Sequence, residues 1–284
     1  MKRVLITGAG SYLGENIAAA LMKEPEDFLV ETLDMQQATW KNVSFSGFDA
    51  VIHVAGIAHQ RETKENAEYY YRINRDLAYD TAEKAKAEGI GQFVFFSSMS
   101  VYGITSGRIT AGTPENPKTH YGKSKLLAEE AIARLSDGSF RVAILRPPMI
   151  YGRGCRGNYP RLSRMVQKLP LFPQVKNERS MLYIGGLCTF VAQLVQSGRG
   201  GLFFPQNCEY VSTDELARQI ALARGKKLWQ PKGAGWLIRL LAKRVGTLGK
   251  VFGTLTYDRE MSQDFADPAE VPFAETIRLT EGGA

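Results

Sequence analysis

The sequence predicts an α/β fold built on a parallel sheet. Two observations support this prediction. Short apolar runs that end in small or hydroxyl-bearing residues alternate with helical patterns over about the first 150 residues. The first of these runs passes through a glycine-rich turn directly into a helix, which is how a βαβ unit begins.

The composition is that of an ordinary globular protein. The chain has 284 residues, 44% hydrophobic and 23% charged, enough for one large domain or two closely joined ones. The three cysteines, Cys155, Cys188 and Cys208, have no CxxC or paired spacing, so we expect a reducing compartment and no metal site. No signal peptide and no run of about 18 apolar residues is visible, so we expect a cytoplasmic protein without a transmembrane segment.

The net charge is +7, from 36 Lys and Arg against 29 Asp and Glu. The sequence has no long basic run and no helix-turn-helix pattern. An anionic small-molecule ligand therefore explains the excess at least as well as nucleic acid does, and we expect no nucleic-acid partner.

The N-terminal strand, turn and helix have the pattern of a dinucleotide-binding fingerprint. Residues 3–7 are apolar, residues 8–14 read Gly-Ala-Gly-Ser-Tyr-Leu-Gly, and a helical pattern covers 16–22. The first glycine permits a tight turn, the last allows close helix–strand packing, and the helix N-terminus offers N–H groups to a pyrophosphate. The candidate cofactor-binding residues here are Gly8, Gly10, Ser11, Tyr12, Leu13 and Gly14. The alternative is an ordinary glycine-rich turn.

The second strand, 28–34, ends in Asp34, which lies about 20 residues after Gly14. A carboxylate at this point hydrogen-bonds the adenosine ribose and repels a 2′-phosphate, so Asp34 favours NAD over NADP. The alternative is that Asp34 only forms the turn after the strand.

A third strand is expected over 49–56, where Ala55 and Gly56 would let the backbone approach the cofactor. Only a shortened crossover fits between Asp34 and this strand. His53 lies inside the apolar run, so we expect a hydrogen-bonded core histidine. A helical pattern follows over 67–88, in which Asn74 either orients the backbone near the site or faces solvent.

A tyrosine and a lysine four residues apart are the candidate catalytic pair. An apolar strand from Phe93 ends in the hydroxyls of Ser97, Ser98 and Ser100, and a helical pattern starts at Tyr121. Tyr121 and Lys125 share one helix face, where the ammonium would lower the pKa of the phenol, and a serine could hold a substrate oxygen. The alternative is an amphipathic surface pair.

Taken together, these motifs resemble the extended short-chain dehydrogenase/reductase superfamily, in the NAD-dependent epimerase/dehydratase group that acts on nucleotide sugars. The matching stretches are residues 7–14, Asp34, 49–56, Asn74, 97–103, 121–125 and 145–152. The resemblance implies a Rossmann-type doubly wound parallel sheet in residues 1–155. It also implies a smaller C-terminal substrate lobe in 156–284, with some chain returning to the sheet.

The resemblance also assigns roles to residues. Tyr121 would be the acid/base, Lys125 would hold the nicotinamide ribose and depress the Tyr121 pKa, and Ser98 would bind the reacting sugar oxygen. Asn74, Ser97 and Pro148 would join the cofactor site. In the lobe, Arg179 and Asn158 would contact the substrate diphosphate, for which a guanidinium is well shaped.

The chain departs from the family pattern at four places. Ser11 replaces the middle glycine of the fingerprint, which a small residue should tolerate. Met99 and Ser100 replace the Asp-Glu pair of dehydratases, which argues against dehydration. Residues 184–187 read Ile-Gly-Gly-Leu where Val-Asp-Asp-Leu is common, and Met149 replaces an asparagine of family epimerases.

Three features of the C-terminal part are less specific. Ser212 or Thr213, ahead of two acidic residues, is a good helix start. The segment 235–246 is basic and amphipathic, so it either packs on its own domain or lies on a membrane surface. The tail, 263–284, is acidic and has no recognisable chemistry.

The expected function is a nucleotide-sugar 4-epimerase, with UDP as the nucleotide at the family level, that works through a 4-keto intermediate with retained NAD. We expect a role in surface polysaccharide precursor synthesis and a homodimer formed through the helices that carry Tyr121 and Asn74. The first alternative is an NAD(P)H-dependent 4-ketoreductase with the same residues. The second is a non-catalytic NAD-binding scaffold.

Overall fold

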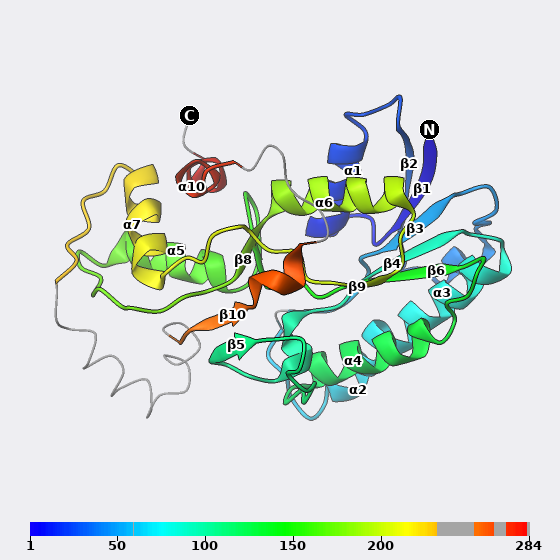
Figure 1. Cartoon of the computed structure of the whole chain (residues 1–284), viewed down its shortest axis with the longest axis horizontal. Coiled ribbons are helices and arrows are strands. Elements are labelled where there is room, and N and C mark those ends of the chain that lie inside the picture. Colours follow the sequence, from blue (N-terminus) through cyan, green and yellow to red (C-terminus); the bar gives the residue numbers. More distant parts are fainter. Residues whose placement is uncertain (59, 232–252, 264–270, 283–284) are drawn as a thin grey trace. The chain divides into compact units, whose positions relative to one another are not determined.

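The computed structural model describes residues 1–58, 60–231, 253–263 and 271–282. The chain forms two compact units that alternate along the sequence (Figure 1). Unit 1 contains residues 1–103, 114–147 and 187–205, and unit 2 contains 104–113, 148–186 and 206–284. The sequence predicts one boundary, at residue 155, whereas each compact unit contains several segments of the chain. The assignment of cofactor binding to residues 1–155 and of substrate binding to 156–284 stays a prediction. The basic segment 235–246 lies outside the described residues.

Unit 1 is built on a parallel sheet, as the sequence predicts, and this sheet has six strands. Its spatial order is β2-β1-β3-β4-β6-β9, and every neighbouring pair is parallel. The strands are β1 (Lys2–Thr7), β2 (Phe28–Leu33), β3 (Ala50–His53), β4 (Gln92–Phe96), β6 (Arg141–Leu145) and β9 (Gly201–Phe203). The chain starts at β1, adds β2 on one side and then crosses to β3 on the other. This reversal brings the carboxyl ends of β1 and β3 together, where doubly wound sheets bind ligands.

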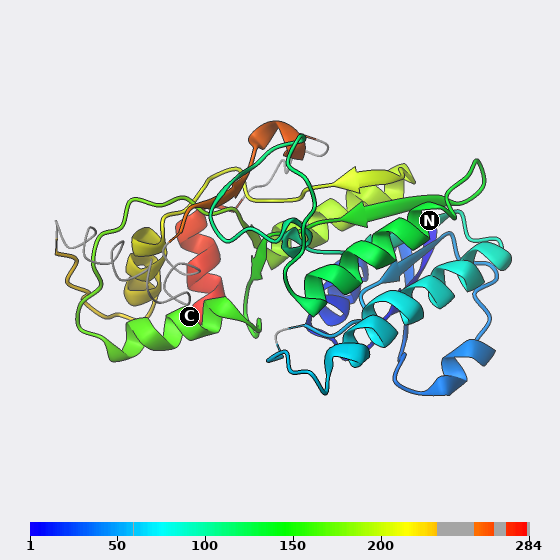
Figure 2. The ribbon, with the colours of Figure 1, turned by 90° about the horizontal axis from the view of Figure 1, so that it is seen from below.

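Helices cover both faces of this sheet (Figure 1). On one side lie α1 (Tyr12–Leu21) and residues 187–197 of α6 (Ile184–Ser197). On the other lie α2 (Ala67–Tyr71), α3 (Leu77–Ala87) and α4 (His120–Ala133). Figure 2 shows α3 and α4 side by side. The sequence places these helices here because α3 and α4 present small or branched apolar residues to the strands.

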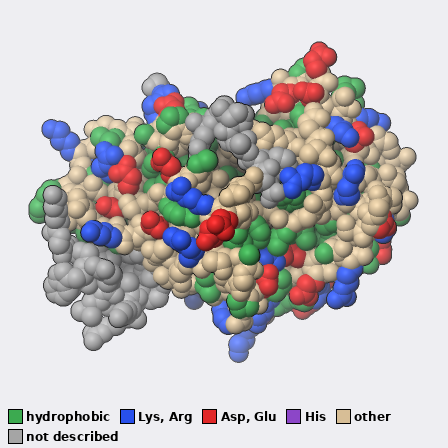
Figure 3. Space-filling model, in the orientation of Figure 1, with side chains coloured by type: hydrophobic (Ala, Val, Ile, Leu, Met, Phe, Trp, Pro, Cys, Tyr) green, Lys and Arg blue, Asp and Glu red, His purple; other side chains and the backbone are tan. Residues whose placement is uncertain are grey.

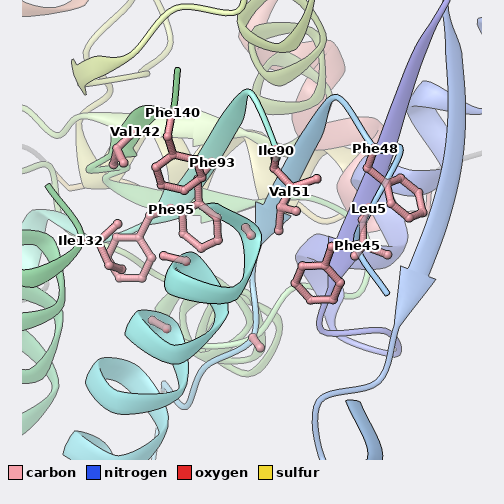
Figure 4. Close-up of a cluster of buried hydrophobic side chains, with 14 of the residues drawn as sticks. Leu5, Phe45, Phe48, Val51, Ile90, Phe93, Phe95, Ile132, Phe140 and Val142 are labelled. Atoms are coloured by element: carbon pink, nitrogen blue, oxygen red, sulfur yellow. The ribbon is translucent and has the colours of Figure 1, made fainter. Parts of the chain in front are cut away.

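The core beneath α3 and α4 is rich in aromatic residues. Phe93 and Phe95 of β4 point toward Ile132 of α4 in Figure 4, and Phe140 packs beside Phe93. The fully buried apolar residues of α3 are all alanines (Ala78, Ala82 and Ala85), with the partly buried Leu77 at its start, so the helix can lie close to the sheet. The buried runs in β3 and β4 explain why these strands read as continuous apolar segments rather than as alternating ones.

The crossover from β2 to β3 contains no α-helix, as the short spacing predicts. A 3₁₀ helix, η1 (Ala38–Asn42), occupies it and buries Trp40. Phe45 and Phe48 then fill the space beside β1 and β3 that a crossover helix would cover (Figure 4).

The predicted single helix over 67–88 is interrupted, which is a correction to the sequence interpretation. A π-helical turn, η2 (Arg72–Asp76), separates α2 from α3 and contains Asn74. A π turn inserts one residue into a helix, often at a functional site.

Unit 2 consists of short parallel strand pairs and amphipathic helices. The pairs are β5 (Gly107–Ile109) with β10 (Leu255–Tyr257), and β7 (Met149–Tyr151) with β8 (Met181–Tyr183). Its helices α5 (Asn158–Lys168), α7 (Thr213–Ala223) and α10 (Phe273–Glu281) share one core. The Ser212 hydroxyl accepts a hydrogen bond from the Glu215 amide at 3.2 Å, which confirms the predicted helix start.

A short 3₁₀ helix and a buried carboxylate lie in the C-terminal part of unit 2. The 3₁₀ helix η4 (Arg259–Ser262) follows β10. The buried Glu281 carboxylate at the end of α10 accepts hydrogen bonds from Tyr159 (2.8 Å), Ser163 (3.0 Å) and Arg224 (2.6 Å). These contacts fix α10 against α5 and α7.

Charged side chains of both signs are interspersed on the face of the molecule drawn in Figure 3. Within the described residues, no helix is both long enough and apolar enough to cross a membrane.

His53 is a core histidine, as predicted. Its Nδ1 lies 2.8 Å from the Thr7 hydroxyl, its ring stacks on Phe93 and Phe95, and its Nε2 is buried without a hydrogen-bond partner among the described residues. Burial, and then the positive charge of Lys125, lower the pKa of His53 to about 3.

We predict that His53 makes stability pH-dependent. The unfolded chain binds a proton near pH 6.5 that the native histidine excludes until about pH 3, so the free energy of unfolding falls as pH falls through this window. The slope should approach about 1.4 kcal/mol per pH unit below pH 6.5. Urea unfolding of His53→Asn, whose amide can still reach Thr7, should show a shallower slope between pH 7.5 and 5. Equal slopes for the two proteins would contradict this.

Candidate active site

The glycine-rich turn connects β1 to α1 with the geometry of a cofactor cradle. Gly8 has φ +105°, and a Cβ there would lie 2.8 Å from the amide nitrogen of Ala55. A Cβ on Gly14 would lie 2.8 Å from the Gly8 carbonyl. The turn, the first turn of α1 and the end of β3 are therefore packed too closely for a side chain at Gly8 or Gly14, which is the close backbone packing of a phosphate-binding turn.

Ser11 explains why the middle glycine can be replaced. Its backbone is extended (φ −83°, ψ 150°), so no glycine is required, and its hydroxyl caps α1 by accepting the Gly14 amide at 3.1 Å. The Glu15 carboxylate accepts the Gly10 amide at 2.9 Å, so one turn amide is paired with a side chain of α1.

Asp34 lies directly after β2, beside this turn. The Leu33 carbonyl accepts hydrogen bonds from the Gly8 and Ala9 amides, at 2.8 and 3.1 Å. The Asp34 carboxylate is exposed and accepts the Gln36 amide at 2.9 Å. The turn-forming role is therefore present, and it leaves the second carboxylate oxygen available.

Asn74 holds the backbone after β3. Its Oδ1 accepts the Ile57 amide at 2.9 Å, and its Nδ2 donates to the Ile57 carbonyl at 3.1 Å and to the Ser124 hydroxyl at 3.2 Å. The side chain is fully buried, so of the two roles left open by the sequence, Asn74 orients backbone rather than facing solvent. The π turn supplies the geometry that points this amide away from α2 and α3 toward Ile57 and α4.

Lys125 is buried at the centre of the site. Its Nζ donates to the Phe96 carbonyl at 2.7 Å and lies over the Phe95 ring, 4.7 Å from its centroid. A Cβ on Gly56 would lie 3.4 Å from Nζ, so the backbone after β3 adjoins the ammonium. Burial lowers the pKa of Lys125 to about 8, and the charge of Glu129 opposes this shift.

Tyr121 and Ser98 are brought together, but the expected pKa direction is wrong. The sequence predicts that Lys125 lowers the pKa of Tyr121. In the structure burial raises the pKa of the phenol, a hydrogen bond with Ser98 acts in the opposite direction, and Tyr70 adds a smaller upward shift. The Lys125 ammonium instead points to the end of β4. The sequence could not anticipate this, because the direction depends on how deeply helix α4 is packed.

Ser98 and Ser97 follow β4 and differ in environment. Ser98 caps a short 3₁₀ helix, η3 (Met99–Tyr102), and its Oγ lies 3.2 Å from the Ser100 hydroxyl. The Ser97 hydroxyl is buried and has no hydrogen-bond partner in the part of the chain that the structure describes. A buried hydroxyl without a partner suits a polar ligand atom, and its position next to Lys125 agrees with the cofactor assignment from the resemblance.

An arginine network behind the catalytic pair was missed by the sequence interpretation. Arg146, at the end of β6, is buried and donates to the Glu129 carboxylate at 2.6 to 3.1 Å, to Glu115 at 2.7 Å and to the Tyr102 hydroxyl at 2.8 Å. Burial alone would lower the pKa of Arg146, but the pairing with Glu129 and Glu115 raises it above its ordinary value.

A signal for this network exists in the sequence. Glu129 follows Lys125 by four residues and Tyr121 by eight, so the three side chains lie along one face of α4. Glutamate is seldom fully buried unless it is paired with a cation. A glutamate on the buried face of α4, such as Glu129, is therefore expected to have a buried cationic partner.

A second missed contact fixes the start of α4. The Glu62 carboxylate accepts the amides of His120 and Tyr121, both at 2.9 Å, and the Thr119 hydroxyl accepts the Gly122 amide at 3.1 Å. Two carboxylate bonds and a cap satisfy the first N–H groups of the helix, so the backbone of Tyr121 is held from outside the helix as well as within it.

The remaining predicted residues lie in unit 2. Asn158 is the exposed first residue of α5. Arg179 precedes β8, burial lowers its pKa, and its guanidinium donates to the Gly253 carbonyl at 2.9 Å. Pro148 begins the segment of unit 2 that follows β6. Among residues 1–58, 60–231, 253–263 and 271–282, no group of three His, Cys, Asp or Glu side chains could hold a metal ion.

We predict that Glu129→Gln lowers the pKa of Lys125 further, because it removes the negative charge that opposes burial and leaves Arg146 partly unpaired. It should also destabilise the protein by about 3 kcal/mol, as expected when one partner of a buried ion pair is lost. NMR titration of lysine-labelled protein, with Lys125 assigned through Lys125→Arg, measures the pKa. Glu130→Gln, at the adjacent exposed position of α4, is the matched control and should change neither quantity. An unchanged Lys125 pKa in Glu129→Gln would refute the coupling.

Comparison with known proteins identifies the family of the chain. A model of the NAD dependent epimerase/dehydratase family matches residues 4–202. The chain is 28% identical to a UDP-glucose 4-epimerase from Vibrio cholerae, over 90% of this chain and 87% of that protein. It is 26% identical to an N-acetyl-alpha-D-glucosaminyl-diphospho-ditrans,octacis-undecaprenol 4-epimerase from Escherichia coli O157:H7, over 70% of this chain and 64% of that protein.

Solved structures share the fold at lower identity. A UDP-glucuronic acid 4-epimerase from Bacillus cereus in complex with NAD has a TM-score of 0.75 at 17% identity, covering 99% of this chain and 95% of that one. A dTDP-4-dehydrorhamnose reductase from Clostridium acetobutylicum has a TM-score of 0.76 at 19% identity, covering 99% and 98%. Because the family model matches residues 4–202, which is more than half of the chain, the chain belongs to the NAD-dependent epimerase/dehydratase family.

Proposed function

We propose that the protein is a UDP-sugar 4-epimerase that retains NAD and acts through a 4-keto sugar. The observation that supports this most directly is the convergence of Tyr121, Ser98 and Lys125 near the ends of β3 and β4, next to the glycine cradle after β1. These three residues supply an acid/base, a hydrogen-bonding hydroxyl and a positive charge. All three are needed to oxidise an alcohol and to reduce the resulting ketone.

The residues of the cradle would hold the cofactor. The turn and the N-terminus of α1, formed by Gly8, Gly10, Ser11, Tyr12, Leu13 and Gly14, would hold the pyrophosphate at the positive end of the helix dipole, and Asp34 would bind the adenosine ribose. Ala55, Gly56, Asn74, Ser97 and Pro148 would line the nicotinamide end. Gly56 would do so by close backbone approach, and Asn74 by holding Ile57 in place. NAD, when bound, supplies the hydride acceptor and donor.

The chain's own residues would move the proton. Tyr121 would take the proton from the sugar hydroxyl at C4 and return it after the keto sugar has turned in the site. Ser98 would hold the sugar oxygen in both steps, and its hydrogen bond lowers the pKa of the phenol against the effect of burial. Lys125, largely protonated below about pH 8, would add positive charge and hold the nicotinamide ribose.

Dehydration does not fit these residues. Elimination of water needs an extra acid and base beside the tyrosine, and η3 offers Met99 and Ser100 at those positions. Neither can serve as a carboxylate acid, so epimerisation or reduction is favoured.

In unit 2, we assign the substrate diphosphate to Arg179 and Asn158. The Arg179 side chain has been desolvated by burial, which strengthens its attraction to phosphate, and Asn158 begins helix α5. The relatives that are 4-epimerases of UDP-glucose and of a diphospho-linked N-acetylglucosamine support a diphosphate-linked hexose. A homodimer through α4 and the helices around Asn74 completes the proposal.

The second candidate is a 4-ketoreductase with the same residues. Two observations favour it: Met149 stands where family epimerases carry an asparagine, and reductases are among the structural neighbours. The third candidate, a non-catalytic NAD-binding scaffold, would be expected to lose Tyr121 or Lys125, and both are present.

Purified protein without added cofactor should convert a UDP-hexose or UDP-N-acetylhexosamine to its 4-epimer. NMR of the sugar protons measures this conversion. Tyr121→Phe should slow this by about 10²-fold or more, because the acid/base is removed. Tyr71→Phe, a phenol that contacts His120 one residue before Tyr121, is the matched control and should stay within a few-fold of the parent. No epimer, with oxidation of NADH by a UDP-4-keto sugar, would identify the reductase. No conversion in either assay would favour the non-catalytic NAD-binding scaffold.

We also predict that Asp34→Asn lowers affinity for NADH by about tenfold and shifts the preference toward NADPH. The amide oxygen still accepts the Gln36 amide, so the turn is kept while the charge is lost. Fluorescence titration with both cofactors measures the change, and Asp27→Asn, an exposed position before β2, is the control. An unchanged ratio of the two affinities would exclude Asp34 as the selectivity residue.

A further inference from the structure

The charge excess is confined to one of the two units. Unit 2 contains 19 Lys and Arg against 11 Asp and Glu, whereas unit 1 contains 17 against 18. The whole net charge of +7 therefore derives from unit 2. Residues 148–177 contain six Lys and Arg and no acid. The proposed diphosphate site uses Arg179, which lies outside this range, so it accounts for none of these six cations.

Helix α5 carries three of these cations on its outer face. Arg161, Arg164 and Lys168 are spaced three and four residues apart and are all exposed, and none forms an ion pair with a described residue. On the opposite face Leu162 and Val166 enter the core of unit 2. The exposed residues of α5 therefore include three cations and no acid, beside the uncharged Asn158 and Gln167.

A short ribbon beside the end of α5 exposes apolar side chains. Leu171 pairs with Trp229 in a parallel bridge, held by the Phe172 amide to the Trp229 carbonyl (2.9 Å) and the Trp229 amide to the Pro170 carbonyl (3.1 Å). Residues paired across two strands point to the same side, and both side chains are exposed, Trp229 by 67% and Leu171 by 42%.

The ribbon is apolar on its exposed side as well as on its buried side, which is unusual for two paired strands at a protein surface. Its inward residues, Phe172 and Leu228, pack in the core, so the outward positions should be polar. They are instead Leu169, Leu171 and Trp229. An outward apolar group of this kind marks a site of contact with another apolar phase or surface.

The basic and apolar groups are adjacent. The Lys226 ammonium donates to the Val166, Gln167 and Leu169 carbonyls, which joins the segment before Trp229 to the end of α5. Lys168 precedes Leu169, and the exposed Lys227 precedes Trp229 by two residues. We call this group the apolar–basic surface: Arg161, Arg164, Lys168, Leu169, Leu171, Lys227 and Trp229.

We propose that the apolar–basic surface docks unit 2 on an anionic lipid bilayer. Leucine and tryptophan side chains that are exposed together, surrounded by unpaired cations, match the interfacial region, where apolar groups enter the acyl boundary and Lys and Arg face lipid phosphates. Nucleic acid would use the cations but would leave the two leucines exposed to water. This inference goes beyond the proposed epimerase activity and does not depend on it.

Flotation of the full chain with vesicles tests the proposal. The parent should bind phosphatidylglycerol vesicles at least tenfold more tightly than phosphatidylcholine vesicles, and binding should weaken as salt is raised. Trp229→Ser combined with Leu171→Ser should weaken binding at least tenfold, and so should the triple change Arg161→Gln, Arg164→Gln and Lys168→Gln.

Matched controls lie in unit 1. Leu202→Ser removes an apolar side chain of similar exposure, and Lys23→Gln, Lys118→Gln and Lys123→Gln remove three exposed cations. Both controls should bind as the parent does. Should the Ser variants fail to fold, the emission of Trp229, taken as the difference between parent and Trp229→Phe, should shift to shorter wavelength with phosphatidylglycerol vesicles.

Four results would overturn the proposal. They are no binding of the parent to phosphatidylglycerol vesicles, parent-like binding by both surface variants, an unshifted Trp229 emission, and a change of oligomeric state in the Ser variant measured by light scattering. The second would place lipid binding elsewhere in the chain, and the last would make the surface a contact between two copies.

Discussion

The arrangement of the candidate site depends on the hydrogen bonds of the buried Arg146 guanidinium. This side chain projects from the end of β6 and binds Glu129 of α4, Tyr102 of η3 and Glu115 at once. Helix α4 carries Tyr121 and Lys125, and η3 begins at Ser98, so one side chain fixes the relative positions of the three candidate catalytic groups. A buried ion pair is seldom a net source of stability. In this protein the network instead fixes the positions of α4 and η3 relative to the end of β6.

Electrostatics and burial act in opposite directions across this site. Burial favours a neutral phenol at Tyr121 and a neutral amine at Lys125, while Glu129 favours the ammonium and Ser98 favours the phenolate. The pKa of Lys125 therefore lies within reach of ordinary working pH instead of far above it. Groups whose environments oppose each other in this way are typical of acid/base sites.

The sequence was sufficient for the parallel sheet, the glycine-rich turn and the helix that carries Tyr121 and Lys125 because these depend on local patterns. Apolar runs, glycine spacing and the four-residue interval between Tyr121 and Lys125 are each readable within a few positions. Three features depend on contacts between distant segments and could not be read in this way: the Arg146 network, the Glu62 carboxylate at the start of α4, and the sign of the Tyr121 pKa shift. The π turn at Asn74 and helix α10 in the acidic tail were also missed, since neither has a distinctive composition.

The π turn has a further consequence for how this fold can change. It holds one residue more than a regular helix needs, and each residue turns an α-helix by about 100°. Losing one residue from Arg72–Asp76 would produce an unbroken helix and a sound hydrogen-bond ladder. It would also rotate α2 relative to α3, so that Asn74 and Tyr70 could no longer face their present partners together. The extra residue thus fixes how α2 is rotated relative to α3, and a change in the length of this segment would alter that rotation.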